Sequence, residues 1–173
     1  LAALMGFILP VGILYTRDSF DDQIPPRQQL AAALDIPVLG ELSYQESSTP
    51  IVITKERGNF AIGEQFRALR AKLYQVLNSD NINNDIGKVT LVTSSTSGEG
   101  KSFISANIAV TLAYAGRKTI ILEMDLRKPK TTLIFGLPEE HPGISDDLDG
   151  EQTNIEKLIR PSGIAGLDVL GCG

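Results

Sequence analysis

A cluster of Ser, Thr and Gly residues, TSSTSGEGKSF, lies between Val92 and Ile104 and contains the triplet Gly-Lys-Ser at 100–102. These residue types suit a loop that binds phosphate, because backbone N–H groups, a lysine and a hydroxyl can all approach anionic oxygens. The same composition also suits a flexible linker. The strict phosphate-loop pattern begins with Gly, whereas this chain has Ser95 at that place. The neighbouring elements must decide between the two interpretations.

The residues on either side of this loop predict a βαβ unit. KVTLVTSS (88–95) is typical of a buried strand, residues 101–116 have the apolar spacing of a helix, and KTIILEMD (118–125) is typical of a second buried strand. LDVL (167–170) predicts one more strand. A phosphate loop belongs between a strand and a helix, so the context favours a nucleotide site. We expect an α/β fold of the P-loop NTPase type, a parallel sheet flanked by helices and incomplete in this chain.

Each residue type in the loop can contribute to phosphate binding. Backbone N–H groups from 97 to 101 can surround the oxygens, and Gly98 and Gly100 permit positive φ. Lys101 would reach the outer phosphates, and the Ser102 hydroxyl would bind Mg²⁺. The predicted nucleotide-binding residues are Ser97, Gly98, Glu99, Gly100, Lys101, Ser102 and Phe103.

An acidic residue, Asp125, ends the strand that follows the loop and its helix. Ligands of open α/β sheets bind at the carboxyl ends of strands, so Asp125 should lie near the phosphates. There its carboxylate can bind Mg²⁺ or take a proton from an attacking hydroxyl. The basic stretch RKPK (127–130) adds positive charge beside it. Lys101 and Asp125 are therefore the predicted catalytic residues, and Ser102 and Asp125 the predicted magnesium ligands.

The first fifteen residues are uncharged and almost entirely apolar. A membrane-spanning helix needs about 20 such residues, and this run begins at the first residue, so we expect a piece of a longer protein. Residues 1–15 would be the end of a transmembrane helix, with a buried core helix as the alternative. We expect a cytoplasmic juxtamembrane segment and linker at 16–50, and the N-terminal part of the nucleotide-binding domain at 51–173.

Composition argues against several other classes of protein. The net charge of -5 and the pI near 4.9 are unlike those of a nucleic-acid binder, so no nucleic-acid partner is expected. The single cysteine, Cys172, cannot form an internal disulfide and suits a reducing compartment. The single histidine, His141, argues against a histidine-based metal site or a Ser-His-Asp triad.

Taken together, the motifs resemble those of the bacterial tyrosine kinases (BY-kinases), the Wzc-like proteins of capsular and exopolysaccharide synthesis. The resemblance rests on SGEGKS in the loop, SANIAV in the next helix and a strand that runs into MDLRKPK. The family's second acidic motif, Walker A′, reads IILEMDLR here. Glu123 takes the place of its first Asp and Asp125 matches the second, so Glu123 joins the candidate magnesium ligands.

A further match lies in EQFRALR, on a stretch (62–77) whose apolar residues have helical spacing. It fits the family's E-x-x-R-x-x-R motif. The resemblance implies that Glu64, Arg67 and Arg70 mediate contacts between neighbouring kinase domains in a ring, whereas the residues alone would suit a solvated helix face.

The resemblance implies an ATP-dependent, Mg²⁺-requiring protein-tyrosine kinase that autophosphorylates in trans within a homo-oligomer. It would lie at the bacterial inner (plasma) membrane, with this segment mainly on the cytoplasmic side. The implied partners are the machinery of polysaccharide polymerisation and export and a tyrosine phosphatase. The family's Walker B strand and C-terminal tyrosine cluster are expected beyond Gly173, so we expect this chain alone to be an incomplete kinase.

Two alternatives remain open at this point. ATPases of the ParA/MinD type share the variant loop but carry a signature lysine where this chain has Thr96. A polysaccharide co-polymerase, or chain-length determinant, would keep a non-catalytic nucleotide domain that only scaffolds oligomers. The substitution at Glu123 is compatible with that second alternative.

Overall fold

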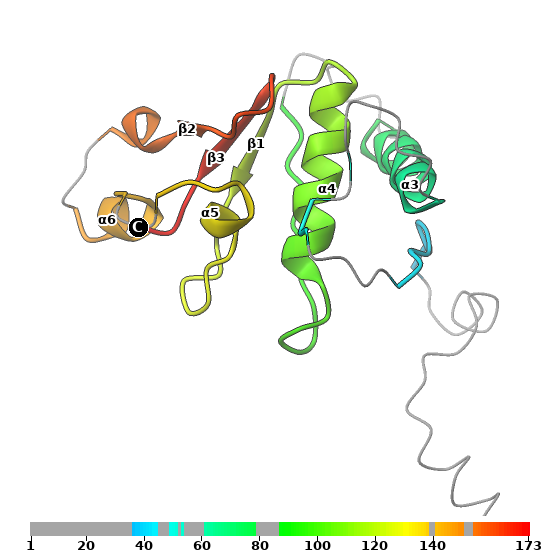
Figure 1. Cartoon of the computed structure of the whole chain (residues 1–173), viewed down its shortest axis with the longest axis horizontal. Coiled ribbons are helices and arrows are strands. Elements are labelled where there is room, and N and C mark those ends of the chain that lie inside the picture. The colour runs from blue at the N-terminus through cyan, green and yellow to red at the C-terminus, as the bar shows by residue number, and fades with distance from the viewer. Residues whose placement is uncertain are drawn as a thin grey trace, which may run out of the picture. The chain divides into compact units, whose positions relative to one another are not determined.

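A computed structural model describes residues 36–44, 49–51, 53, 61–78, 87–138, 141–150 and 154–173. The chain from Leu39 to Gly173 forms one compact unit, and Figure 1 shows its elements. The transmembrane end predicted at 1–15 lies outside the described residues, as does most of the predicted juxtamembrane segment. No helix in the described part of the chain is both long enough and apolar enough to cross a membrane.

Two helices form one side of this unit. Helix α3 (Ala61–Leu77) confirms the helix predicted from apolar spacing, and it buries Ile62 and Phe66. Helix α4 (Lys101–Tyr114) follows the phosphate loop and lies between α3 and the sheet (Figure 1). The ring of Phe66 meets that of Phe103 on α4 with centroids 5.8 Å apart and planes tilted by 59°. This tilted aromatic pair helps to fix α3 against the first turn of α4.

The sheet has three strands in the order β1-β3-β2. Strand β1 (Thr119–Leu122) pairs in parallel with β3 (Leu167–Leu170), with Thr119 opposite Leu167. Strand β2 (Arg160–Pro161) pairs with β3 in the antiparallel direction, so the sheet is mixed and not wholly parallel as predicted. Only a short turn joins β2 to β3, and such a turn reverses the chain and forces antiparallel pairing. Between β1 and β2 lie α5 (Thr131–Ile134), α6 (Ile144–Leu148) and the 3₁₀-helix η1 (Ile155–Leu158).

The prediction of a buried strand at 88–95 is wrong for the described structure. Residues 87–94 have no assigned secondary structure and belong to no ladder, and Val89 and Leu91 are 89% and 81% exposed. A strand requires neighbouring backbone for its hydrogen bonds, and among the described residues β1 pairs with β3 instead. The apolar run therefore predicted a preference for burial, but it could not identify a pairing partner.

The core lies where α4 meets α3 on one side and the sheet on the other. Its members are mostly aliphatic residues of these elements, together with Ile53 from the segment before α3: Ile53, Ile62, Phe66, Ala109, Val110, Ala113, Ile121 and Leu167. Because α4 is covered on both sides, it is apolar around most of its circumference. Burial on two sides holds α4, whose first turn follows the phosphate loop, in a fixed place.

A buried amide on α4 attaches the segment around residue 50 to the helix. Asn107 is fully buried, and its Nδ2 donates to the carbonyl oxygens of Phe103 (2.8 Å) and Pro50 (3.0 Å). Its Oδ1 accepts the backbone N–H of Ile53 at 3.3 Å. These bonds satisfy a polar group that would otherwise destabilise the core. They also bring Pro50 to the edge of the hollow described next.

Candidate nucleotide-binding site

The Ser/Gly-rich loop leads directly into the first turn of α4. Gly98 and Gly100 have φ of 99° and 97°, as predicted, and Gly100 immediately precedes the first helical residue, Lys101. A left-handed residue at this point lets the loop curl over the helix N-terminus, where backbone N–H groups lack partners in the helix. The 14-residue helix adds the positive end of its dipole to the same place. The loop thus has the local geometry of an anion site.

A hollow of about 240 Å³ opens between this loop and the segment after β1. On the loop side, the hollow is lined by every predicted nucleotide-binding residue except Glu99. The lining combines polar and basic residues with apolar ones, and it consists of Pro50, Ser97, Gly98, Gly100, Lys101, Ser102, Phe103, Asp125, Lys128, Lys130 and Ile134. A polyanion of the size of a few phosphates suits such a hollow.

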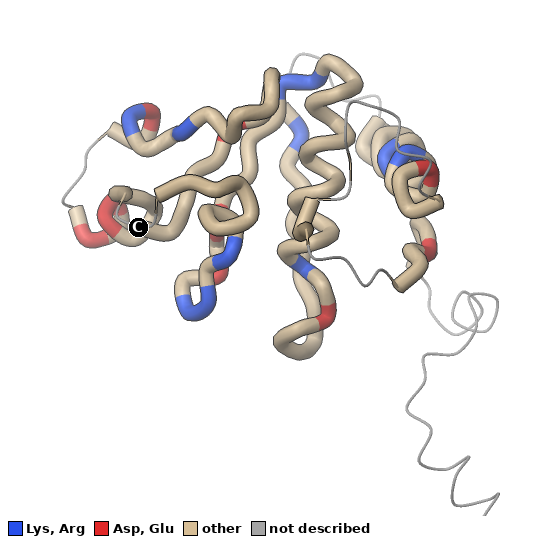
Figure 2. The backbone as a smooth tube through the Cα atoms, in the orientation of Figure 1, with Lys and Arg blue, Asp and Glu red and all other residues tan. Residues whose placement is uncertain are grey.

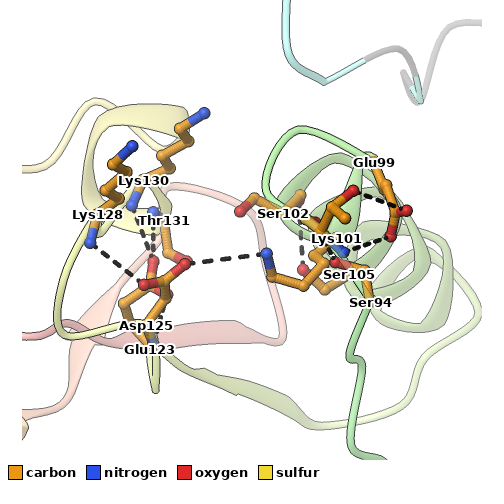
Figure 3. Close-up of polar contacts among 11 residues, drawn as sticks. Ser94, Glu99, Lys101, Ser102, Ser105, Glu123, Asp125, Lys128, Lys130 and Thr131 are labelled. Atoms are coloured by element: carbon orange, nitrogen blue, oxygen red, sulfur yellow. Dashed lines mark hydrogen bonds and ion pairs between the residues drawn. The ribbon is translucent and has the colours of Figure 1, made fainter.

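The two predicted catalytic residues face each other across this hollow. Lys101 begins α4 and Asp125 follows β1, and their Nζ and Oδ2 atoms are 3.9 Å apart (Figure 3). The two side chains are 29% and 38% exposed, so solvent still reaches the pair. The other oxygen of Asp125 accepts the backbone N–H of Lys128 at 3.2 Å, which orients the carboxylate. The pair is longer than a hydrogen bond and about one third exposed, so both groups remain accessible to a ligand in the hollow.

Basic side chains of the segment after β1 add positive charge to the site. Figure 2 shows the basic residues gathered on this segment (127–130), and Lys128 and Lys130 line the same hollow as Lys101. Arg127 is exposed and is not part of the lining. Three ammonium groups around one hollow attract a highly charged anion.

Glu123, the residue that replaces the first acidic position of the second motif, is turned into its own loop. It is only 6% exposed, and its carboxylate accepts the backbone N–H groups of Asp125 (3.3 Å), Lys130 (3.0 Å) and Thr131 (2.7 Å). Both carboxylate oxygens are thus used by the main chain. Glu123 acts as a brace that closes the segment between β1 and α5 and so sets the position of Asp125, Lys128 and Lys130.

Glu99 lies on the rim of the phosphate loop and points back toward its start. Its carboxylate accepts the backbone N–H of Thr96 (3.2 Å), the Thr96 hydroxyl (2.9 Å) and the Ser95 hydroxyl (3.0 Å). These bonds, with the Thr96 backbone N–H first among them, lower the pKa of Glu99 to about 2. Sequence reasoning placed Glu99 among the nucleotide contacts and missed this contact within the loop. The spacing Thr-x-x-Glu, which is that of a capping box, was the available signal.

The residues predicted to mediate contacts between domains lie along α3. Glu64 and Arg67 form an ion pair one turn apart on the exposed side of the helix. Arg70 is partly buried and donates to the carbonyl oxygen of Thr111 on α4 at 3.1 Å. Glu64 and Arg67 are therefore available at the surface, whereas Arg70 also holds α3 to α4.

Comparison with known proteins identifies the nucleotide-binding domain. Residues 90–170 match the family of CobQ/CobB/MinD/ParA nucleotide binding domains. CapB of Staphylococcus aureus, which carries the name of a tyrosine-protein kinase, is 36% identical over 132 residues. The matched region covers 76% of this chain and 55% of CapB. The tyrosine-protein kinase etk of Escherichia coli K12 is 30% identical over 75% of this chain, which is 17% of etk. The chain thus spans about half the length of the first relative and far less of the second.

Solved structures agree with these relatives. The chimerical protein CapA2B2 is 35% identical and superposes with a TM-score of 0.66 over 84% of this chain and 59% of its own. The kinase domain of Escherichia coli ETK is 25% identical and gives a TM-score of 0.66 over 84% of this chain and 58% of its own. The named relatives are tyrosine kinases and not partitioning ATPases. By its motifs, its relatives and its fold, the chain belongs to the Wzc-like bacterial tyrosine kinases, and its core is a nucleotide-binding domain of the P-loop type.

Proposed function

We propose that the protein is an ATP-dependent protein-tyrosine kinase that phosphorylates tyrosines of other copies of itself. The observation that carries the proposal is the hollow at the N-terminus of α4, where Lys101 faces Asp125 at 3.9 Å beside Lys128 and Lys130. A carboxylate next to a set of cations suits phosphoryl transfer, in which a hydroxyl must be held near a highly charged phosphate.

The residues of the hollow suggest how ATP would be bound. Backbone N–H groups of residues 97–101 and the ammonium of Lys101 would hold the phosphate chain, with Lys128 and Lys130 neutralising its charge. The acceptor tyrosine oxygen would attack the γ-phosphorus and give up its proton to Asp125, as the bond between that phosphorus and the ADP oxygen breaks. Because ADP leaves with the electron pair of that bond, the cations around the hollow would stabilise the charge that develops.

The chain also offers oxygen ligands that suit Mg²⁺. Ser102 and Asp125 line the same hollow, and hydroxyl and carboxylate oxygens are the ligands that this hard cation prefers. Among the described residues there is no group of three acidic, His or Cys side chains that could hold a metal alone. This fits a cation bound by one or two protein oxygens together with phosphates. When bound, Mg²⁺ would neutralise phosphate charge, and Glu123 would act through the loop that it braces.

The activity can be tested on the full-length protein with labelled ATP. We expect label on tyrosine in the wild type and a loss of at least about a hundredfold in Lys101→Ala, since a charged contact to the transferring phosphate is removed. Lys118→Ala, at an exposed lysine beyond the end of α4, is the matched control and should label like the wild type. Absence of tyrosine label in the wild type, or equal labelling of Lys101→Ala, would refute the proposal. ATP binding without transfer would instead favour a scaffolding co-polymerase.

The wider setting is also part of the proposal. We place the protein at the bacterial inner membrane, with residues 1–15 as the end of a membrane helix and the kinase domain on the cytoplasmic side, because the run is uncharged and apolar. Its oligomer would use the exposed pair Glu64 and Arg67, and Arg70 beside it, in a ring. Polysaccharide polymerisation and export proteins would be partners, and a tyrosine phosphatase would reverse the modification. Membrane fractionation tests the location, and recovery of the protein in the soluble fraction would contradict it. The oligomeric state of Arg67→Glu tests the interface, and an unchanged oligomer would contradict that assignment.

A further inference from the structure

The phosphate loop contains a carboxylate at a place where a negative charge is unfavourable. Glu99 stands between Gly98 and Gly100, within the loop that would surround the phosphates of ATP. Like charges in one loop repel, so a bare carboxylate here should weaken the binding of a polyanion. Glu99 is charged at neutral pH like an ordinary glutamate, and hydrogen bonds from Thr96 and Ser95 lower its pKa further, to about 2. The benefit that offsets this repulsion must come from the contacts that the side chain makes.

Those contacts lie on the outer side of the loop. Glu99 does not line the hollow, and Figure 3 shows its carboxylate on the side of the loop away from Asp125. It is bound by three donors at the loop start, namely the backbone N–H and hydroxyl of Thr96 and the hydroxyl of Ser95. Ser94 adds a contact within the same turn, because its hydroxyl donates to the Thr96 carbonyl oxygen at 2.8 Å.

The bonds of Glu99 join the start of the loop to its end. The two donor residues come before the turn and Glu99 comes two residues before α4 begins, so the carboxylate closes the turn like a clasp. The strict pattern has Gly at the position of Ser95, and this chain instead uses the Ser95 hydroxyl as a donor. With the Thr96 N–H occupied, the backbone N–H groups from Ser97 onward are left for a ligand in the hollow.

We propose that Glu99 is a positioning residue that holds the phosphate loop in its binding shape before the nucleotide arrives. The proposal rests on the proposed function, because it assumes that the hollow binds ATP. Without the clasp, the loop must be ordered at the moment of binding, which lowers affinity. Once phosphates are bound they order the loop themselves, so turnover at saturating ATP should change little.

The sign of the change in affinity separates this role from a plain charge effect. In the full-length protein, Glu99→Ala should raise the Kd for the ATP analogue AMP-PNP about tenfold, the cost of ordering about one residue of backbone. If the carboxylate contributed only its charge, the same substitution would relieve repulsion and lower the Kd. Calorimetry or a fluorescent competition assay measures the difference. A Kd equal to or below that of the wild type would overturn the proposal.

A second variant removes the donors while keeping the charge. Ser95→Ala combined with Thr96→Val retains Glu99 but deletes two of its three donors. We expect the Kd to rise about threefold to tenfold, because each lost bond to a charged group weakens the clasp. Glu99→Gln keeps the size and can accept one N–H, so its Kd should fall between those of the wild type and Glu99→Ala. Unchanged binding in the double variant would contradict the clasp.

Kinetic and stability measurements complete the test. The KM for ATP should rise in Glu99→Ala while kcat stays within about twofold, as expected when only binding before catalysis is affected. The melting temperature should fall only slightly, since Glu99 is exposed; a large drop would mean a general structural role and overturn the proposal. Glu156→Ala, which deletes an exposed acidic side chain on η1, should bind like the wild type. Wild-type protein that binds no AMP-PNP would refute the proposed function itself, whereas wild-type binding with an unaffected Glu99→Ala would refute only this inference.

Discussion

Glu123 offers a sharp test of how the site is built, because its carboxylate is buried and bonded only to the main chain in the described structure. In Glu123→Ala, three backbone N–H groups lose a charged acceptor, at distances of 2.7, 3.0 and 3.3 Å. A hydrogen bond to a charged group contributes about 1.5–3 kcal/mol. The longest bond contributes least, and water can enter to replace part of the loss, so we expect destabilisation of about 3 kcal/mol in total. For a domain of this size, that corresponds to a melting temperature about 10 °C lower.

Two measurements on the purified protein check this expectation. Chemical denaturation followed by circular dichroism gives the free energy of unfolding, and hydrogen exchange reports the amides of Lys130 and Thr131, which should lose protection. Glu123→Gln keeps the volume but presents an amide to three donors, so its stability should fall between those of the wild type and Glu123→Ala. Glu156→Ala removes an exposed carboxylate and serves as the control. If Glu123→Ala unfolds with the same free energy as this control and both amides stay protected, the brace does not exist.

Three further predictions concern the core and the loop. Phe66→Ala deletes a fully buried ring and should cost about 3–5 kcal/mol of unfolding free energy, measured by denaturant titration; a cost no greater than that of an exposed substitution would contradict the packing. In Gly100→Ala the added methyl group would meet no neighbouring atom, but the residue would have to adopt a φ of 97°. The resulting strain of about 1–2 kcal/mol should weaken AMP-PNP binding, which calorimetry measures, and unaltered affinity would count against the loop geometry. The Glu99 carboxyl, followed by NMR, should titrate near pH 2 and not at its ordinary value of 4.5. Because the pKa of Glu99 is lower in the folded state, its hydrogen bonds stabilise the folded loop fully above pH 4.5, and this stabilisation is lost as the pH falls toward 2. A titration midpoint near 4.5 would show that the clasp is absent.

Local features of the chain could be predicted from its sequence because they depend on near neighbours. The apolar spacing of 62–77 predicted α3 within one residue, since helical periodicity is a property of the segment itself. The positive φ of Gly98 and Gly100 followed from the same kind of local rule. The proximity of Lys101 and Asp125 could also be predicted, because ligands of open α/β sheets bind at the carboxyl ends of strands, where both Asp125 and the phosphate loop were expected.

Features that depend on distant partners could not be predicted in this way. The run at 88–95 contains Val89, Leu91 and Val92, yet in the described structure it joins no ladder whereas β1 pairs with β3, because pairing depends on which strand is available. The antiparallel direction of β2 comes from a turn that joins two short segments. The role of Glu123 depends on main-chain groups seven and eight residues away, so an acidic motif alone could not distinguish a metal ligand from a structural brace.

The measurement that tests the central claim most directly is the rate of tyrosine phosphorylation by the full-length protein with Asp125→Asn beside the wild type. Phosphotyrosine is quantified by mass spectrometry after mixing with ATP and Mg²⁺, and AMP-PNP binding is measured on the same samples. We expect the rate to fall by about a hundredfold or more, the usual contribution of a positioned acid–base group, while AMP-PNP remains bound. A variant that phosphorylates tyrosine at the wild-type rate would contradict the assignment of the hollow between Lys101 and Asp125 as the catalytic site.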